Sequence, residues 1–276
     1  MEITELSELR NVADYTQVVK CEINGEDILE EDFEKIEQMI NLNRLVVTPH
    51  SQTSLPETFG CKLVNLCYLD LTYIQFEKLP EFFGINMVSL NYLDLSHNAL
   101  LKIPSGIQNL VELKTLYLSD NQLTEFPVFL ERLVNLNALS ISENEFTNFP
   151  DVICKFINLT YLSISNNKLE SLPYNIDNLV KLEILDAYGI HITTLPDTFK
   201  NLVNLKQLQI SNNDITIFPE VLKSLINLKE LDLFDNQITT IPEFVRDMVN
   251  LKELSIFNNP IPTIPEFVRN IVVKYS

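Results

Sequence analysis

The sequence has few basic residues and no long apolar run. Only 20 Lys and Arg stand against 38 Asp and Glu, which gives a formal net charge of −18. A field of this sign repels nucleic acid and anionic lipid, and it favours partners with a basic surface. The acidic residues are scattered, so most of them are expected to form a solvated surface. The apolar runs are far too short for a membrane span.

The motifs that carry common enzyme chemistry are also missing. The five glycines form neither a GxGxxG pattern nor a P-loop, so no phosphate cradle is encoded. No HExxH motif or paired-cysteine spacing occurs, and no convincing nucleophile, base and acid can be nominated. We therefore expect no catalytic residue, no metal site and no cofactor, and we predict that the protein is not an enzyme.

The four cysteines are scattered along the chain at Cys21, Cys61, Cys67 and Cys154. This distribution favours a reducing compartment. The N-terminus "MEITELSELR" is acidic and lacks an apolar core, so it does not look like a secretory signal. We expect a cytoplasmic protein. Secretion or display on a cell surface, by a route not visible in this chain, is the alternative.

One spacing of apolar residues recurs through most of the chain. The stretch "LKELDLFDNQITTIPEF" at 228–244 returns as "LKELSIFNNPIPTIPEF" from Leu251. Steps of 23 residues, and finally two of 24, lead back from Leu251 through Leu228, Leu205, Leu182, Leu159, Leu136, Leu113, Leu90, Leu66 and Leu42. Ten repeats of the form LxxLxLxxNxLxxLPxxLxxL therefore run from about 42 to 271.

This unit resembles the 23-residue leucine-rich repeat with a Leu-Pro on its returning arm. It is similar to the repeats of the Ras-suppressor and adenylate-cyclase group and of many bacterial leucine-rich-repeat proteins. The resemblance implies an α/β fold, a right-handed solenoid shaped like a horseshoe. A parallel β-sheet would form its concave face and short irregular or 3-10 arms its convex face. Such a fold is compatible with many functions.

The chemistry of the unit agrees with that fold. Each LxL segment predicts a short strand with both leucines inward and its neighbours toward solvent. An amide after the strand can satisfy backbone groups of a buried turn. These amides are Asn98, Asn121, Asn144, Asn167, Asn213, Asn236 and Asn259. Proline fixes the returning arm, at Pro80, Pro104, Pro127, Pro150, Pro173, Pro196, Pro219, Pro242 and Pro265.

The repeats predict two domains, a strand and helix cap at 1–41 and ten repeats at 42–276 without an obvious C-terminal cap. A strand is expected at 19–23 and a helix at 26–41. The predicted helix has an apolar face made of Leu29, Phe33, Ile36 and Ile40, and its "EEDFE" carboxylates face solvent. An uncapped end would leave apolar surface, which indicates truncation, a minimal cap or self-association through the C-terminal edge.

Aromatic and acidic side chains gather on the predicted concave face. Tyr and Phe are enriched in interface cores, and Phe234 and Phe257 have no polar tip that would explain exposure. Carboxylates beside them would orient a partner with a basic surface. The residues predicted to bind are Tyr68, Asp70, Tyr92, Asp94, Tyr117, Tyr161, Asp186, Tyr188, Glu230, Asp232, Phe234 and Phe257.

Two local departures from the consensus could carry function. His97, Asp120 and Glu143 occupy equivalent places in three consecutive repeats, about 5 Å apart. They could hold a divalent cation, but an ordinary polar rim is favoured. In the repeat "LEILDAYGIHIT", Ile190 replaces the asparagine, and Gly189 is expected to permit a local backbone adjustment.

The sequence thus predicts a non-catalytic scaffold or signalling module that binds a protein partner on its concave face. Two alternatives remain. The chain could be the recognition part of a secreted or surface effector of the virulence type, or the substrate-recognition fragment of a larger enzyme. No segment outside the repeats exceeds roughly 40 residues, which is too short for a separate catalytic domain.

Overall fold

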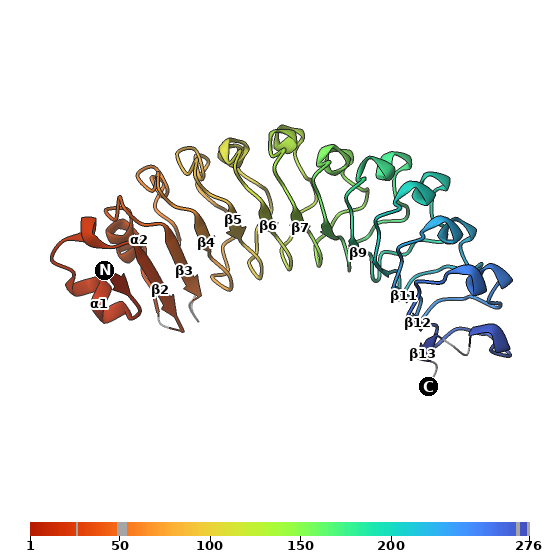
Figure 1. The fold of residues 1–276 in the computed structure, drawn as a ribbon. Coiled ribbons are helices and arrows are strands. Elements are labelled where there is room, and N and C mark those ends of the chain that lie inside the picture. The colour runs from red at the N-terminus through yellow and green to blue at the C-terminus, as the bar shows by residue number, and fades with distance from the viewer. Residues whose placement is uncertain (26, 49–53, 269–270, 275–276) are drawn as a thin grey trace. The chain divides into compact units, whose positions relative to one another are not determined.

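The computed structural model describes residues 1–25, 27–48, 54–268 and 271–274. The chain divides into two compact units, Met1–Leu139 and Ser140–Ser276, here called the N-terminal unit and the C-terminal unit. Within each unit, neighbouring strands are parallel and follow one another in chain order. The strands lie on the inner side of the curve that successive repeats form in each unit, and the short 3-10 turns lie on the outer side (Figure 1).

The N-terminal unit begins with two helices interleaved with strands and continues with one strand per repeat. Its strands are β1 (Glu2–Ile3), β2 (Lys20–Asn24), β3 (Arg44–Thr48), β4 (Tyr68–Asp70), β5 (Tyr92–Asp94) and β6 (Thr115–Tyr117). Its helices are α1 (Leu6–Asn11), α2 (Glu30–Ile36) and the 3-10 turns η1 (Tyr15–Gln17), η2 (Ser105–Asn109) and η3 (Val128–Arg132). The strand β7 (Ala138–Ser140) contains the last residues of this unit.

The C-terminal unit consists of strands and 3-10 turns among its described residues. Its strands are β8 (Tyr161–Ser163), β9 (Ile184–Asp186), β10 (Gln207–Gln209), β11 (Glu230–Asp232), β12 (Glu253–Ser255) and β13 (Val272–Lys274). Its turns are η4 (Asp151–Lys155), η5 (Tyr174–Asn178), η6 (Asp197–Asn201), η7 (Glu220–Ser224), η8 (Glu243–Asp247) and η9 (Glu266–Val268). The predicted solenoid of parallel strands and short arms is confirmed. The repeat pattern did not predict β13.

Leucine spacing builds the core because equivalent leucines stack from strand to strand. Leu69, Leu93 and Leu116 are in register in neighbouring strands, and each is fully buried. The prolines act as predicted: Pro104 has a φ of −70° and precedes η2 directly. Among the described residues, no helix combines the length and apolar character needed to cross a bilayer.

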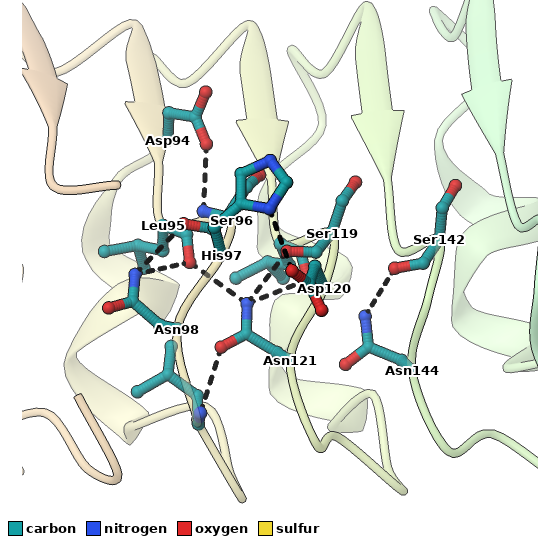
Figure 2. Close-up of polar contacts among 12 residues, drawn as sticks. Asp94, Leu95, Ser96, His97, Asn98, Ser119, Asp120, Asn121, Ser142 and Asn144 are labelled. Atoms are coloured by element: carbon teal, nitrogen blue, oxygen red, sulfur yellow. Dashed lines mark hydrogen bonds and ion pairs between the residues drawn. The ribbon is translucent and has the colours of Figure 1, made fainter. Parts of the chain in front are cut away.

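The predicted asparagine ladder is present, and Asn121 illustrates it (Figure 2). Its side-chain nitrogen donates to the carbonyl oxygens of Leu95, Leu118 and Ser119 at 3.0, 3.1 and 3.2 Å. Its side-chain oxygen accepts from the Leu100 amide at 2.9 Å. The amide thus replaces the strand partners that a tight turn cannot supply.

A second asparagine ladder was not predicted. Asn204, Asn227 and Asn250 donate to the carbonyl oxygens of Val180, Val203 and Ile226, one repeat earlier, at 2.7, 2.8 and 2.7 Å. Asn65 and Asn135 make the equivalent bond. The signal was in the sequence, because each of these residues directly precedes the first leucine of a repeat.

The prediction for the first long helix was partly wrong. Leu29 and Ile40 are 51% and 43% exposed, although Phe33 and Ile36 are buried. The reason is that α2 spans only Glu30–Ile36, so both exposed residues lie outside it and the spacing of a helical face does not apply to them.

The acidic run of α2 was predicted to face solvent as a whole, and Asp32 contradicts this. The Asp32 side chain is fully buried and binds Nε and Nη2 of Arg10 at 3.0 and 2.7 Å. It also accepts from the Leu29 amide and from Lys35 Nζ at 3.1 Å each. Burial by itself raises the pKa of Asp32, but these donors outweigh it and hold the pKa below its usual value. Asp32 thus joins α1 to α2.

One residue per repeat has a left-handed backbone just before the ladder position. The residues of this rim are Tyr73, His97, Asp120, Glu143, Asn166, Gly189, Asn212, Asp235 and Asn258, with φ between +50° and +62°. Gly189, with φ +59°, has the ordinary conformation of its position, and the local departure of this repeat lies two residues later, where His191 also has a left-handed φ of +59°. A Cβ atom at Gly189 would lie 2.8 Å from Asn166 Oδ1, which explains the glycine.

Candidate functional site

The surface formed by outward-pointing strand residues is here called the strand face, and in the N-terminal unit it carries three tyrosines in contact. Tyr68 and Tyr92 stack with ring centroids 4.1 Å apart and planes at 3°. Tyr117 meets Tyr92 edge to face at 5.9 Å. These three residues, here called the tyrosine row, were predicted to cluster, and the structure brings them together because β4, β5 and β6 pair in register.

A cation from the chain itself covers one end of the tyrosine row. The Arg44 guanidinium lies 3.6 Å from the centre of the Tyr68 ring, at cation–π distance. Arg44 Nε also donates to Glu22 Oε1 at 2.6 Å. The sequence did not predict this contact, since the register places Arg44 beside Tyr68 but does not fix the conformation of its side chain.

The two carboxylates beside the tyrosine row are partly desolvated. Tyr92 Oη donates to Asp94 Oδ2 at 3.3 Å. Burial raises the pKa of Asp70, and the neighbouring charge of Asp94 adds to this, against a hydrogen bond from Thr72. Burial also raises the pKa of Tyr92, so this hydroxyl stays protonated and acts as a donor. This part of the face offers aromatic contact area and few free charges.

The strand face of the C-terminal unit contains a groove of about 360 Å³, here called the acidic groove. Its lining residues are Tyr161, Ile184, Asp186, Gln207, Leu208, Gln209, Glu230, Leu231, Asp232, Glu253 and Ser255. Four of the predicted binding residues are among them: Tyr161, Asp186, Glu230 and Asp232. With Glu253, which was not predicted to bind, the lining contains four carboxylates. The lining contains no lysine or arginine.

The chain itself holds the carboxylates of the groove in place. Ser163 Oγ donates to Asp186 Oδ2 at 3.0 Å, and Ser165 Oγ donates to the other oxygen. Gln207 Nε2 donates to Glu230 Oε2 at 2.8 Å. Both serines are buried, and sequence reading treated them as ordinary consensus residues. Neutral donors thus fix these carboxylates without cancelling their charge.

Two phenylalanines continue the face beyond the groove. Phe234 and Phe257 stack at 5.4 Å with planes at 13°, and Phe257 is 38% exposed. The Phe234 amide donates to Asp232 Oδ1 at 2.9 Å, which connects the stack to the groove. Tyr188 lies half-buried at the equivalent position of its own repeat. Burial raises the pKa of Tyr161 in the groove wall, so it also remains a neutral donor.

The rim residues form pairs rather than a metal site. His97 Nδ1 lies 2.9 Å from Asp120 Oδ2 (Figure 2), and Tyr73 stacks on the His97 ring at 4.2 Å. His191 Nδ1 lies 3.5 Å from Asp214 Oδ2. The part of the chain that the structure describes contains no group of three His, Cys, Asp or Glu that could hold a metal ion. The stack of Tyr73 on His97 was not predicted.

Comparison with known families identifies the repeats. The leucine rich repeat model matches residues 64–123, and the leucine-rich repeat region model matches residues 150–263. No curated protein matches the chain. Solved structures do match. A leucine-rich-repeat protein of Leptospira interrogans is 28% identical with a TM-score of 0.76, over 92% of this chain and 70% of that one.

Two further structures share the architecture. An internalin from Listeria monocytogenes is 22% identical with a TM-score of 0.70, over 92% of this chain and 80% of that one, which shows the fold alone. The ectodomain of the Arabidopsis thaliana receptor kinase GASSHO1/SCHENGEN3, in complex with CASPARIAN STRIP INTEGRITY FACTOR 2, is 25% identical with a TM-score of 0.72. That match covers 99% of this chain but only 32% of the receptor chain. The repeats, their ladders and these matches place the chain in the leucine-rich-repeat family.

Proposed function

We propose that the chain is a non-catalytic interaction module that binds a protein partner with a basic surface on its strand face. The observation that carries this proposal is the acidic groove, where four carboxylates surround about 360 Å³ without a lysine or arginine in the lining. Charge complementarity would steer a basic partner and fix its orientation. The leucine-rich-repeat fold is a protein-interaction module in related proteins, and the Arabidopsis receptor above is in complex with another molecule.

The tyrosine row and the phenylalanine pair would supply the apolar part of this interface. Aromatic side chains lose little conformational entropy on binding and often dominate interface energetics. In the proposal, Tyr68, Tyr92 and Tyr117 form one contact region, and Phe234 and Phe257 form another. Their ring contacts in the unbound chain hold them in place before a partner arrives, which lowers the entropic cost of binding.

The contacts of the polar groups on the strand face support a binding role without catalysis. The hydroxyls of Ser163 and Ser165 donate to the Asp186 carboxylate, and a carboxylate alone is too weak a base to activate a serine. The groove lining contains no histidine or lysine that could do so. His97 lies against Asp120 on the rim, and His191, two residues after the rim residue Gly189, lies against Asp214. The third histidine, His50, lies outside the described residues. The groove therefore offers fixed negative charge rather than a nucleophile.

A comparison of two variants tests the proposal. The first replaces Tyr68, Tyr92, Phe234 and Phe257 with alanine. The matched control replaces four residues exposed outside the strand face, Leu101, Val128, Tyr174 and Ile217, which are 59%, 67%, 74% and 79% exposed. Each variant and the parent chain would be used to capture proteins from an extract of the source cells, with mass spectrometry as the readout and circular dichroism to verify folding.

We expect the parent and the control to retain the same basic proteins and the strand-face variant to lose them. Retention of one set of proteins by both variants would place the interface elsewhere and refute the proposal.

A further inference from the structure

The carboxylates of the acidic groove form two groups separated by an uncharged strand. Asp186 in β9 is in register with Gln209 in β10, which is in register with Asp232 in β11. Parallel neighbours are about 4.8 Å apart, so Asp186 and Asp232 lie about 9.6 Å apart across the sheet. The middle strand contributes Gln207, Leu208 and Gln209 to the lining, none of which is charged.

The first group is Asp186 with the aromatic wall next to it. Ser163 donates to one oxygen of Asp186, Ser165 and the Tyr188 amide donate to the other, and an ionised carboxylate has about four acceptor positions. Acceptor capacity for a ligand therefore remains. Tyr161 lies in the adjacent strand β8, where Ser163 pairs with Asp186 in register. A cationic side chain held by Asp186 would lie near the Tyr161 ring, at a place suited to a cation–π contact.

The second group is Glu230, Asp232 and Glu253, from the neighbouring strands β11 and β12. Three carboxylates in one wall attract a second cation. Between the two groups, Gln209 is exposed, and its amide can both donate to and accept from a peptide backbone. The buried Leu208 and Leu231 form an apolar floor. The groove is thus charged at two points and neutral between them.

We propose that the acidic groove is a two-point receptor for an extended segment of a partner protein that carries two cationic side chains separated by two residues. This inference rests on the proposed function and specifies its partner. In a polyproline II conformation, every third side chain lies on the same face and is displaced by about 9.3 Å, which matches the separation of the two groups. In a β-strand, side chains on one face repeat every about 6.8 Å, which is too short.

The length of the groove agrees with such a segment. From β8 to β12 there are four strand steps, or about 19 Å, which corresponds to about six residues of polyproline II at 3.1 Å each. The segment would cross the strands and place one cation at Asp186 and one at the Glu230, Asp232 and Glu253 group. Phosphate-bearing ligands are disfavoured because every charged lining residue is an acid.

The test uses fluorescein-labelled proline-rich peptides with two lysines separated by one, two or four prolines, so that all carry the same charge. Binding to the full chain is measured by fluorescence anisotropy at low ionic strength. We expect the peptide with two intervening residues to bind about fivefold more tightly than the other two, since only it forms both ion pairs.

Charge-neutral variants assign this preference to the groove. Asp186→Asn and Asp232→Asn, at the two carboxylates whose separation sets the spacing, should each remove the spacing preference, and Asp232→Asn leaves the serine contacts of Asp186 untouched. The matched control is Asp235→Asn, which makes the same charge change on the exposed rim of the same unit, at a left-handed position where asparagine is well tolerated. This control should retain the preference.

Spacing-independent binding, or equal weakening by Asp235→Asn, would overturn the inference, because net charge alone would then explain binding. Absence of binding by all three peptides would also overturn it. The proposed function would still stand in that case if the captured partner were lost by the four-residue strand-face variant. Retention of the partner by that variant would instead refute the proposed function itself.

Discussion

The strand faces of the two units are built by the same repeat, but they differ in whether a cationic side chain lies beside their aromatic and acidic residues. In the N-terminal unit, Arg44 supplies a cation at 3.6 Å from the Tyr68 ring, and the tyrosines contact one another. In the C-terminal unit, the carboxylates of the acidic groove are held by serines and a glutamine, and the lining contains no cation. The repeat fixes where side chains point, and a few substitutions decide whether an arginine or only neutral donors lie beside the aromatic and acidic residues of a face.

We expect the largest loss of stability from substitutions in the asparagine ladder, in which the two units differ. In the C-terminal unit, Asn213 Oδ1 accepts from the amides of both Ile190 and Ile192, at 3.2 and 3.1 Å. Asn121 Oδ1 of the N-terminal unit accepts from the Leu100 amide at 2.9 Å. Because each buried unpaired group costs about 1–3 kcal/mol, Asn213→Ala should lower the free energy of unfolding by roughly 4 kcal/mol and Asn121→Ala by roughly 3. Urea denaturation measures both, and losses below about 1 kcal/mol would show that the ladder is not structurally important.

The next largest loss of stability should follow from removing Asp32 and should be confined to the N-terminal unit. Asp32→Ala removes the buried carboxylate that joins α1 to α2, with an expected loss of roughly 3 kcal/mol at neutral pH. The pKa of Asp32 is lowered in the fold, so its contribution is present above the ordinary pKa of an aspartate and is lost as the pH falls through the lowered value. Amide hydrogen exchange should report the loss near α1 and α2 and not in the C-terminal unit.

The exposed neighbour Glu31 provides the control for this prediction. Glu31→Ala should change the free energy of unfolding by less than about 0.5 kcal/mol. An equal effect of both substitutions would mean that helix charge, and not the buried ion pair, is the cause.

A smaller effect follows from giving the C-terminal unit an internal cation, as Arg44 does in the N-terminal unit. Gln209→Arg places a guanidinium between Asp186 and Asp232, which are its register partners. We expect affinity for the two-lysine peptide to fall about tenfold, since the groove's charge is then satisfied from within. Gln237→Arg makes the same chemical change at an exposed position outside the groove lining. If both variants weakened binding equally in the anisotropy assay, the contrast between the two faces would be one of net charge only.

The smallest change in stability is expected for Asp70 and Asp186, two aspartates at equivalent positions of their strands. Burial raises the pKa of Asp70, so the ionised form is disfavoured in the fold. Its contribution to stability is present at low pH and is lost as the pH rises through the raised pKa. Asp70→Asn should therefore raise the free energy of unfolding at pH 7 by less than about 1 kcal/mol and have no such benefit at pH 3. Asp186→Asn should instead lower it at pH 7, because it replaces one of the two oxygens that accept from the serine hydroxyls with an amide nitrogen that cannot accept. Thermal unfolding at both pH values measures this, and a benefit from both substitutions would remove the distinction.

The solenoid could be predicted because a spacing of 23 residues, repeated from Leu90 to Leu251, is compatible with few backbones. The pleat also placed Tyr68, Tyr92, Phe234 and Asp232 on one face correctly, although whether they bind a partner stays a prediction. Features that depend on side-chain conformation were missed: the Arg44 stack, the serine donors of Asp186 and the groove itself. Hydrophobic periodicity carries no information on these, because they arise between residues one repeat apart.

The predicted bounds of the first long helix were wrong for a related reason. The pattern that included Leu29 and Ile40 has helical spacing, but the hydrogen bonds of Asp32 to the Leu29 amide and to Arg10 begin the helix at Glu30 and hold it against α1. The bond to the Leu29 amide is a local cap between residues three apart, whereas the bond to Arg10 joins residues 22 apart and is absent from any local window.

The left-handed residue before each ladder position constrains how the family can vary. Non-glycine residues with positive φ are mostly Asn, Asp or His, because their short polar side chains bond locally to the backbone. On this rim, the residue type therefore reflects the left-handed backbone and not recognition of a ligand, as at Asp120, Asp235, Asn212 and His97. A designer who wishes to redirect such a protein to a new target should leave that rim unchanged and diversify the strand columns, where the backbone imposes no such filter.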